Sequence, residues 1–364
     1  MKIFMESPKN YQFSEKYTVE HLSYSKFLNS KVLITDFLKH GISSSSLYAR
    51  LVNPGFIQKL YHEKDSGYMA YLKEFYDRFH DFDVIVMNPG IDLVHPEFLY
   101  KHFKKSLKCL HFTDDPHLTY NYGFPFLWAF DCATYVSPSY SADYSMEEIL
   151  HLAGADHVKW VPHCISNINS PNYNEIDILN NLDNRINKVV YIGNYYKTKT
   201  DRLIQLKKSL KNSFDIYGKY PLNGYLFPLL SILEGELNFK RIKTLSNSER
   251  EDIYSKYAIG INMHLSTPSM ETGNARLYEL AYRGVSQVVD SSIYSSVDQI
   301  FSPENEILTY ENIEECISQT NRLLNDKELR INLAMNAYKK AKQEYSYQKV
   351  TDNTFKWFSF LINN

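Results

Sequence analysis

The stretch METGNARLYELAYRGVSQVVD, residues 270–290, decides the fold of this chain. Asn274 is a favourable N-cap, and residues 275–283 are mostly good helix formers. Gly284 provides a stop at the C-terminus of that helix. Residues 285–290 then form a short apolar run, typical of a buried strand. The order of loop, helix, glycine and strand predicts one unit of an α/β fold.

Two glutamates lie on either side of the expected helix start, with seven residues between them: Glu271 before the helix and Glu279 within it. A helix that starts next to Gly273 offers unbonded backbone N–H groups and a positive dipole end, which suit an anion such as a diphosphate. Arg276, in the first turn, is unfavourable for the dipole, but it fits there if a phosphate shares the site. The stretch therefore predicts an anion site at Asn274.

This arrangement resembles the donor site of two-domain, GT-B-type glycosyltransferases. The pattern N-x-R-x-x-E-x-x-x-x-G before a strand ending in Asp is most similar to the CgeB-like, spore-maturation-type branch. The resemblance covers most of residues 83–360 and is strongest over 189–290. In retaining members the first glutamate lies beside the donor sugar and the second binds the nucleotide ribose, which implies these roles for Glu271 and Glu279. The alternative is an amphipathic helix with two solvated glutamates, because a lone Glu-x7-Glu arises by chance in many helices.

Length and composition favour a protein of two ordinary domains. The chain has 364 residues, 44% of them hydrophobic, which is enough for two cores. The net charge of −2 gives no basic field for nucleic acid. The four cysteines have no CxxC spacing or metal-ligand clustering, so they are predicted to be reduced core thiols of a cytoplasmic protein: Cys109, Cys132, Cys164 and Cys316.

The N-terminus, MKIFMESPKN, has no apolar core of a secretory signal, and no apolar run approaches the roughly 20 residues of a membrane span. We therefore expect a cytoplasmic location, and peripheral contact with the inner membrane face stays open.

The first half of the chain alternates strands and helices, as in a doubly wound parallel sheet. The expected strands are residues 2–5, 31–36, 83–88, 108–113, 133–137 and 158–161, and the expected helices are 66–79, 96–105 and 145–152, with another from residue 47. Ligands bind beyond the carboxyl ends of such strands. Five polar residues follow these strand ends and are candidates for the cleft: Asp114, Asp115, His117, Ser137 and His163.

Residues 165–185 are rich in Asn, Asp, Ser and Pro and are predicted to form a linker. We place the boundary between an acceptor domain, residues 1–183, and a nucleotide-sugar domain, residues 184–364. The expected strands of the second domain are residues 188–193, 214–218, 241–244, 258–263, 285–290 and 306–309, and the expected helices are 202–210, 246–256, 275–283, 313–324, 326–344 and 347–360. The resemblance implies two Rossmann-like sheets facing one cleft, with the tail, residues 346–364, packing back on the first domain.

A second candidate phosphate site follows the strand at residues 188–193. Gly193 and Asn194 form a turn in which glycine permits close approach to a ligand, and Arg202 could balance its charge. Lys197 and Lys199 are rival cations, and an ordinary strand-to-helix turn is an equal alternative. His264, which follows a strand next to the glutamate loop, contacts the donor or only ends the strand.

Activation of an acceptor would need a carboxylate or a histidine on the first domain, and Asp115 and His117 are the candidates, with a structural turn as the alternative. Asp81-Phe82-Asp83 has the form of a D-x-D metal motif, but it precedes its strand, whereas that motif follows one. We therefore read it as a turn and expect no essential metal.

The resemblance implies a metal-independent glycosyltransferase whose donor substrate is a nucleotide-diphosphate sugar, with no separate cofactor. Its acceptor would be a glycan, a lipid-linked sugar or a protein, in polysaccharide or glycoconjugate synthesis, with retention of anomeric configuration. The catalytic candidates are Glu271, Asp115 and His117, and the donor-binding candidates are Gly193, Asn194, Arg202, His264, Gly273, Asn274, Arg276 and Glu279. Two alternatives remain, a sugar-nucleotide epimerase on the same fold and a non-catalytic relative that binds glycans or nucleotides.

Overall fold

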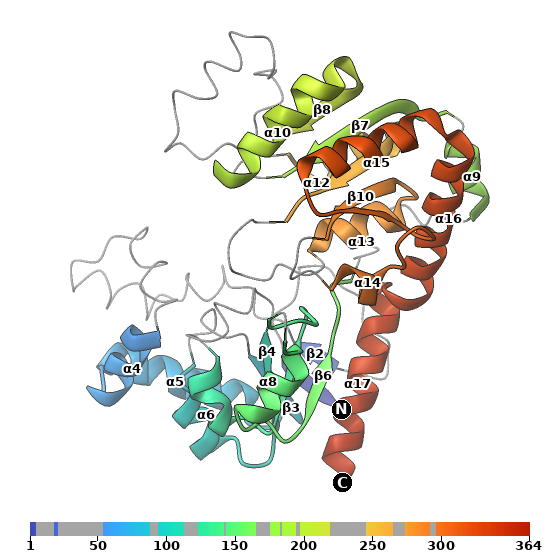
Figure 1. Ribbon diagram of the computed structural model, residues 1–364. Coiled ribbons are helices and arrows are strands. Elements are labelled where there is room, and N and C mark those ends of the chain that lie inside the picture. The colour runs from blue at the N-terminus through green and yellow to red at the C-terminus, as the bar shows by residue number, and fades with distance from the viewer. Residues whose placement is uncertain are drawn as a thin grey trace. The chain divides into compact units, whose positions relative to one another are not determined.

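Two parallel sheets organise the chain in the computed structural model (Figure 1). The structure describes residues 1–4, 18–20, 54–87, 94–112, 123–141, 143–164, 175–182, 184–193, 197–218, 245–264, 274–291 and 296–364. One sheet has the strand order β2-β1-β3-β4-β5-β6, and the other has the order β11-β10-β9-β7-β8. All of the described strand pairs are parallel. The predicted fold class, two doubly wound parallel sheets, is confirmed.

The strands of the first sheet are β1 (Lys2–Phe4), β2 (Thr18–Glu20), β3 (Val84–Met87), β4 (Leu107–Phe112), β5 (Cys132–Tyr135) and β6 (Val158–Trp160). Its helices are α4 (Pro54–His62), α5 (Ser66–Phe79), α6 (Pro96–His102), the 3-10 helix η1 (Phe124–Ala129) and α8 (Met146–Leu152). These elements belong to a compact unit of Met1–Pro162 and Thr351–Asn364.

Successive side chains along each strand of this sheet point to opposite faces, as the two-residue repeat of a β-strand requires. Ile85 and Met87 of β3 belong to a core with residues of α5, α6 and α8. Val84 and Val86, which alternate with them, belong to a second core that includes Phe355. Every side chain of β3 is therefore buried, which explains why its sequence is uniformly apolar.

The second core contains the C-terminal helix α17 (Tyr347–Asn363). Phe355 and Phe358 of α17 are buried with Cys109 and Cys132 of the first sheet. The tail thus covers one face of the first sheet, and the expected return of the C-terminal helix is confirmed. Both cysteines are free and buried, in agreement with their prediction as core thiols.

The second unit comprises His163–Val350. Its strands are β7 (Ile186–Ile192), β8 (Phe214–Tyr217), β9 (Tyr257–Asn262), β10 (Ser286–Asp290) and β11 (Leu308–Tyr310). Its helices are α9 (Glu175–Leu182), α10 (Lys197–Leu210), the 3-10 helix η2 (Lys211–Ser213), α12 (Asn247–Lys256), α13 (Ala275–Tyr282), α14 (Val297–Ile300), α15 (Ile313–Asn325) and α16 (Lys327–Glu344).

Two cores lie on the two faces of the second sheet. Val189 and Tyr191 of β7 pack with apolar residues of α10 and α15. Val190 and Ile192 alternate with them and pack with Tyr254 of α12 and Leu280 of α13. This alternation holds α13 against the face opposite to α10, and it fixes where the N-terminus of α13 lies.

The compact units divide between Pro162 and His163, whereas the boundary predicted from the sequence lies between residues 183 and 184. Helix α9 lies inside the stretch that was expected to be a linker. Ile178 and Leu182 of α9, four residues apart, pack with residues of α16. In this segment two apolar residues at helical spacing are sufficient for a packed helix, although the surrounding composition is polar.

Several expected elements lie outside the described residues, namely the strands at residues 31–36 and 241–244 and the helix from residue 47 up to the start of α4. Strand β2 lies in a segment whose sequence pattern predicts no element. Helix α14 was not predicted either.

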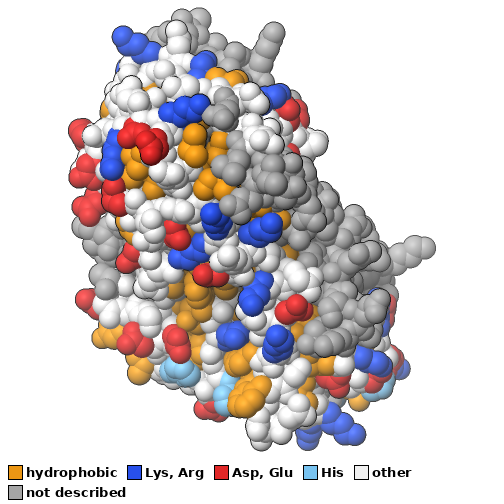
Figure 2. All heavy atoms as spheres, turned by 90° about the vertical axis from the view of Figure 1, so that its right-hand side faces the viewer, with side chains coloured by type: hydrophobic (Ala, Val, Ile, Leu, Met, Phe, Trp, Pro, Cys, Tyr) orange, Lys and Arg blue, Asp and Glu red, His pale blue; other side chains and the backbone are white. Residues whose placement is uncertain are grey.

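In the part of the chain that the structure describes, no helix is both long and apolar enough to cross a membrane. On the face drawn in Figure 2, basic and acidic side chains are interspersed, in keeping with the net charge of −2.

Candidate functional site

Helix α13 begins as its sequence predicts. The Oδ1 atom of Asn274 accepts a hydrogen bond of 3.3 Å from the backbone N–H of Leu277, which makes Asn274 the N-cap. At the other end, Gly284 has a φ of +61°, in the left-handed region that favours glycine. Ala275 is exposed and Arg276 is half-buried, so the first turn of α13 lies partly at the surface.

Arg276 reaches from the first turn of α13 to the carboxyl end of β7. Its Nε atom donates to the carbonyl oxygen of Ile192 across 2.7 Å. Its guanidinium lies over the ring of Tyr191, 4.7 Å from the ring centroid. A Cβ atom on Gly193 would lie 2.5 Å from Nη2 of Arg276, so glycine leaves room for the guanidinium in this position. The structure thus brings three predicted residues together, namely Gly193, Asn274 and Arg276.

Asn262, the last residue of β9, joins this group and was not among the candidates of the sequence analysis. Its Oδ1 atom accepts from Nδ2 of Asn274 at 2.8 Å and from Nη1 of Arg276 at 3.2 Å. Asn262 is fully buried. The sequence signal for Asn262 is a polar residue at the carboxyl end of a predicted central strand, because ligands bind at that edge of such sheets.

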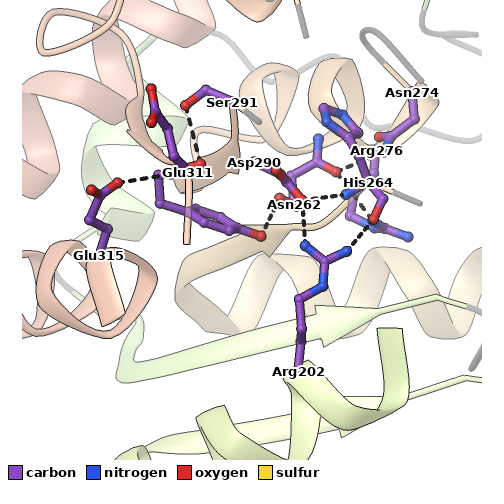
Figure 3. A network of polar contacts seen from close by, with 10 residues as sticks. Arg202, Asn262, His264, Asn274, Arg276, Asp290, Ser291, Glu311 and Glu315 are labelled. Carbon is purple, nitrogen blue, oxygen red and sulfur yellow. Dashed lines mark hydrogen bonds and ion pairs between the residues drawn. The ribbon is translucent and has the colours of Figure 1, made fainter. Parts of the chain in front are cut away.

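Arg202 and His264 meet at Asp290, the last residue of β10 (Figure 3). Arg202 donates to Oδ2 of Asp290 at 2.7 Å and to the carbonyl oxygen of His264 at 2.5 Å. The backbone N–H of His264 donates to the same Asp290 oxygen at 3.3 Å. The guanidinium of α10 therefore ties the ends of β9 and β10 together. This contact is structural, and the expected role of Arg202 at a phosphate stays a prediction.

Glu279 lies one turn further along α13 and faces α12. Its Oε1 atom is 3.2 Å from Nη2 of Arg250. A second ion pair joins Glu251 of α12 to Arg283, the C-cap residue of α13. Arg283 also donates to the backbone oxygen of Glu279 at 2.7 Å. The ion pair with Arg250 gives the Glu279 carboxylate a defined direction.

Five predicted site residues lie outside the described residues: Asp115, His117, Asn194, Glu271 and Gly273. Their roles stay predictions. Asp114, a further cleft candidate, also lies outside them, whereas Ser137 is buried and follows β5 closely. The ring of His163 lies edge-on to Tyr278, with 6.1 Å between the centroids.

The Asp81-Phe82-Asp83 segment precedes β3, as the sequence indicated. Asp81 forms an ion pair with Lys2, and Asp83 accepts a hydrogen bond of 2.6 Å from the Lys2 backbone. These carboxylates thus hold the start of β1. Among the residues that the structure describes, no group of three or more His, Cys, Asp or Glu side chains could hold a metal ion.

Comparisons with known proteins agree with this architecture. Residues 200–356 match a family model described as glycosyl transferase-like. The chain is similar to sucrose-phosphate synthase from Thermosynechococcus elongatus, with a TM-score of 0.57, 10% identity, and coverage of 84% of this chain and 80% of that one. It is similar to HepE from Anabaena in complex with UDP-glucose, with a TM-score of 0.54, 13% identity and coverage of 79% and 81%.

The N-terminal domain of Candida albicans trehalose-6-phosphate phosphatase is also similar, with a TM-score of 0.63, 9% identity and coverage of 98% of this chain and 95% of that one. At such identities the likeness shows the fold. A search of curated proteins gave no match. The chain thus has the two-sheet GT-B fold, and its residues 200–356 match the glycosyl transferase-like family model.

Proposed function

We propose that this protein is a glycosyltransferase that moves a sugar from a nucleotide-diphosphate donor to an acceptor hydroxyl. In this reaction the bond between the anomeric carbon and the diphosphate breaks, a glycosidic bond to the acceptor oxygen forms, and the acceptor loses its proton. The second unit would bind the donor and the first unit the acceptor. We infer the CgeB-like branch from the pattern around Asn274, Arg276 and Glu279, and retention of configuration from the Glu-x7-Glu pair.

One observation carries the proposal, namely the position of Arg276 at the start of α13. A cation in the first turn is unfavourable for the helix dipole. Here it lies beside Gly193 and the carboxyl end of β7, within a domain of glycosyl transferase-like sequence. A diphosphate at this helix start would receive backbone N–H groups and a positive charge together. The similar fold of HepE, solved with UDP-glucose, supports a donor of this class.

The remaining roles follow from the resemblance. Glu271 would orient the donor sugar, Glu279 would bind the ribose, and Asp115 or His117 would take the proton of the acceptor. Gly193 and Asn194 would admit the diphosphate, with Arg202, His264 and Gly273 around it. We propose that the reaction needs neither a metal ion nor a separate cofactor, and that its product is a cell-surface polysaccharide or glycoconjugate.

A screen of thermal unfolding against nucleotides and nucleotide sugars tests the donor class. A ligand at one hundred times its Kd stabilises the folded protein by about 2.7 kcal/mol, so the true donor should stand out. Donor hydrolysis and transfer are then measured with that nucleotide sugar. Binding without turnover would favour a non-catalytic relative, and conversion of the donor sugar without any acceptor would favour an epimerase.

A further inference from the structure

Asn262 occupies the junction between the central strand β9 and the start of α13. Both groups that donate to its Oδ1 atom belong to this helix start, the N-cap Asn274 and Arg276 in the first turn. Figure 3 shows the three side chains converging there. The backbone oxygen of Asn262 accepts from the Tyr310 hydroxyl at 3.3 Å, which further fixes the residue.

The orientation of the Asn262 amide follows from chemistry. Arg276 is only a donor, so the Asn262 atom that it contacts must be the oxygen. The contact with Asn274 also requires the oxygen of Asn262. The Asn274 oxygen accepts from the Leu277 N–H, so the Asn274 nitrogen faces Asn262 and donates to it. The Nδ2 atom of Asn262 therefore points away from both partners, and its assignment does not depend on a choice between amide flips.

This Nδ2 atom is buried, and no described residue accepts a hydrogen bond from it. A buried donor without an acceptor is destabilising, so native structures satisfy nearly all of them. The donor lies at the carboxyl edge of β9, where ligands of doubly wound sheets bind. Its neighbours are the N-cap of α13 and a guanidinium, both of which favour an anion.

We propose that Asn262 is a ligand-binding residue whose amide N–H groups donate to an oxygen of the donor diphosphate at the start of α13. The inference rests on the proposed function and adds a residue to it. Oδ1 positions Asn274 and Arg276, and Nδ2 contacts the anion. One side chain thus aligns the cation and supplies a donor to the same ligand.

Two substitutions separate contact from positioning. Asn262→Asp keeps an oxygen for Asn274 and Arg276 but places a second carboxylate oxygen where Nδ2 lies. Asn262→Ala removes both functions. We expect both variants to bind UDP about ten- to one-hundred-fold more weakly than the wild type in calorimetric titration, with Asn262→Asp at the larger end. UMP should lose less affinity, and uridine should change little, because the effect acts on the diphosphate.

Asn187→Asp is the matched control. Asn187 lies near the opposite end of β7, and its oxygen accepts from Arg330 while its nitrogen donates to the Leu324 carbonyl. This variant should keep the UDP affinity of the wild type. Thermal unfolding of each variant without ligand shows that the protein is folded during the titration.

Three results would overturn the inference. If Asn262→Asp binds UDP like the wild type while Asn262→Ala does not, Asn262 only positions its neighbours. An equal loss for uridine and UDP would show a general distortion instead of a diphosphate contact. In both cases the proposed function stands. If the wild type binds no nucleotide diphosphate, the proposed function fails and the inference fails with it.

Discussion

Arg250 of α12 and Glu279 of α13 form an ion pair of 3.2 Å. The side chain of Glu279 is 17% exposed and that of Arg250 is 35% exposed. Both side chains are half-buried, and the ion pair orients the Glu279 carboxylate.

The proposed ribose contact predicts the behaviour of Glu279→Gln. The contact would be present in ground and transition states alike, so the variant should have a raised donor KM and weaker binding of the free nucleotide diphosphate, by about 1–3 kcal/mol. Calorimetry and initial rates measure both. Glu251→Gln is the control, because Glu251 of α12 pairs with Arg283 at the end of α13, and this variant should affect stability alone. If Glu279→Gln binds the nucleotide diphosphate as tightly as the wild type does, Glu279 does not contact the ribose.

Glu271→Gln should behave differently from Glu279→Gln. Positive charge develops on the sugar as the glycosidic bond loosens, and a carboxylate beside it stabilises mainly the transition state. The variant should therefore lower kcat more than it raises KM, with nearly unchanged affinity for the nucleotide diphosphate. Steady-state rates and titrations measure this split. A silent substitution would remove Glu271 from the site.

The ion pair between Arg202 and Asp290 should matter more for stability than an exposed pair of the same length. Asp290 is 2% exposed, and Arg202→Met would leave its carboxylate buried with one partner fewer. We expect a loss of about 3 kcal/mol or more in the free energy of unfolding. Arg322→Met is the matched control, because Arg322 and Glu304 are also 2.7 Å apart but largely exposed, and it should cost about 1 kcal/mol or less. Urea unfolding measures both, and equal losses would contradict the structural role of Arg202.

The stability of the first unit should depend on the protonation of His95. Burial, with a smaller contribution from the nearby His62, lowers the pKa of His95 to about 4. Its Nδ1 atom accepts from the backbone N–H of Glu97 at 3.2 Å, and protonation would abolish this cap of α6. The folded pKa lies below the unfolded value of about 6.5, so the folded state binds fewer protons. The contribution is present above pH 6.5 and is lost as the pH falls toward 4, by up to roughly 3 kcal/mol.

His95→Asn is the informative variant, because asparagine is a good N-cap and does not titrate. Chemical unfolding between pH 7 and pH 4.5 should show a smaller decline in stability for His95→Asn than for the wild type. Parallel pH dependences for the two proteins would assign the acid sensitivity to other groups.

Transfer should survive chelation. The Asp81-Phe82-Asp83 carboxylates bind the start of β1, and this position does not suit a metal ion that holds a diphosphate. We expect EDTA to leave the rate of transfer unchanged, measured with the donor that the thermal screen identifies. Loss of turnover on chelation, with recovery on adding Mn²⁺ or Mg²⁺, would reveal a metal site.

The sequence by itself determined the elements whose signals are local. Helix α5 has the predicted bounds, 66–79, because its apolar positions recur at helical spacing. Ser145 and Ser246 begin α8 and α12 with capping boxes, in which each hydrogen bond joins residues three apart. Asn274 and Gly284 bound α13 in the same way. Such interactions form within one turn of helix, so residues close together in the sequence are sufficient to predict them.

Only the tertiary structure decided the partners across the sheets. Arg202 contacts Asp290, 88 residues away in the chain. The contact depends on the strand order β10-β9-β7-β8, because α10 connects β7 to β8 and so lies near the carboxyl ends of β9 and β10. Asn262 became part of the candidate site in the same way, through contacts with a helix start that follows twelve residues later. The polar stretch around Ile178 forms a helix because its apolar residues pack against apolar residues of α16. These outcomes depend on strand order and packing, which bring together residues that no local pattern connects.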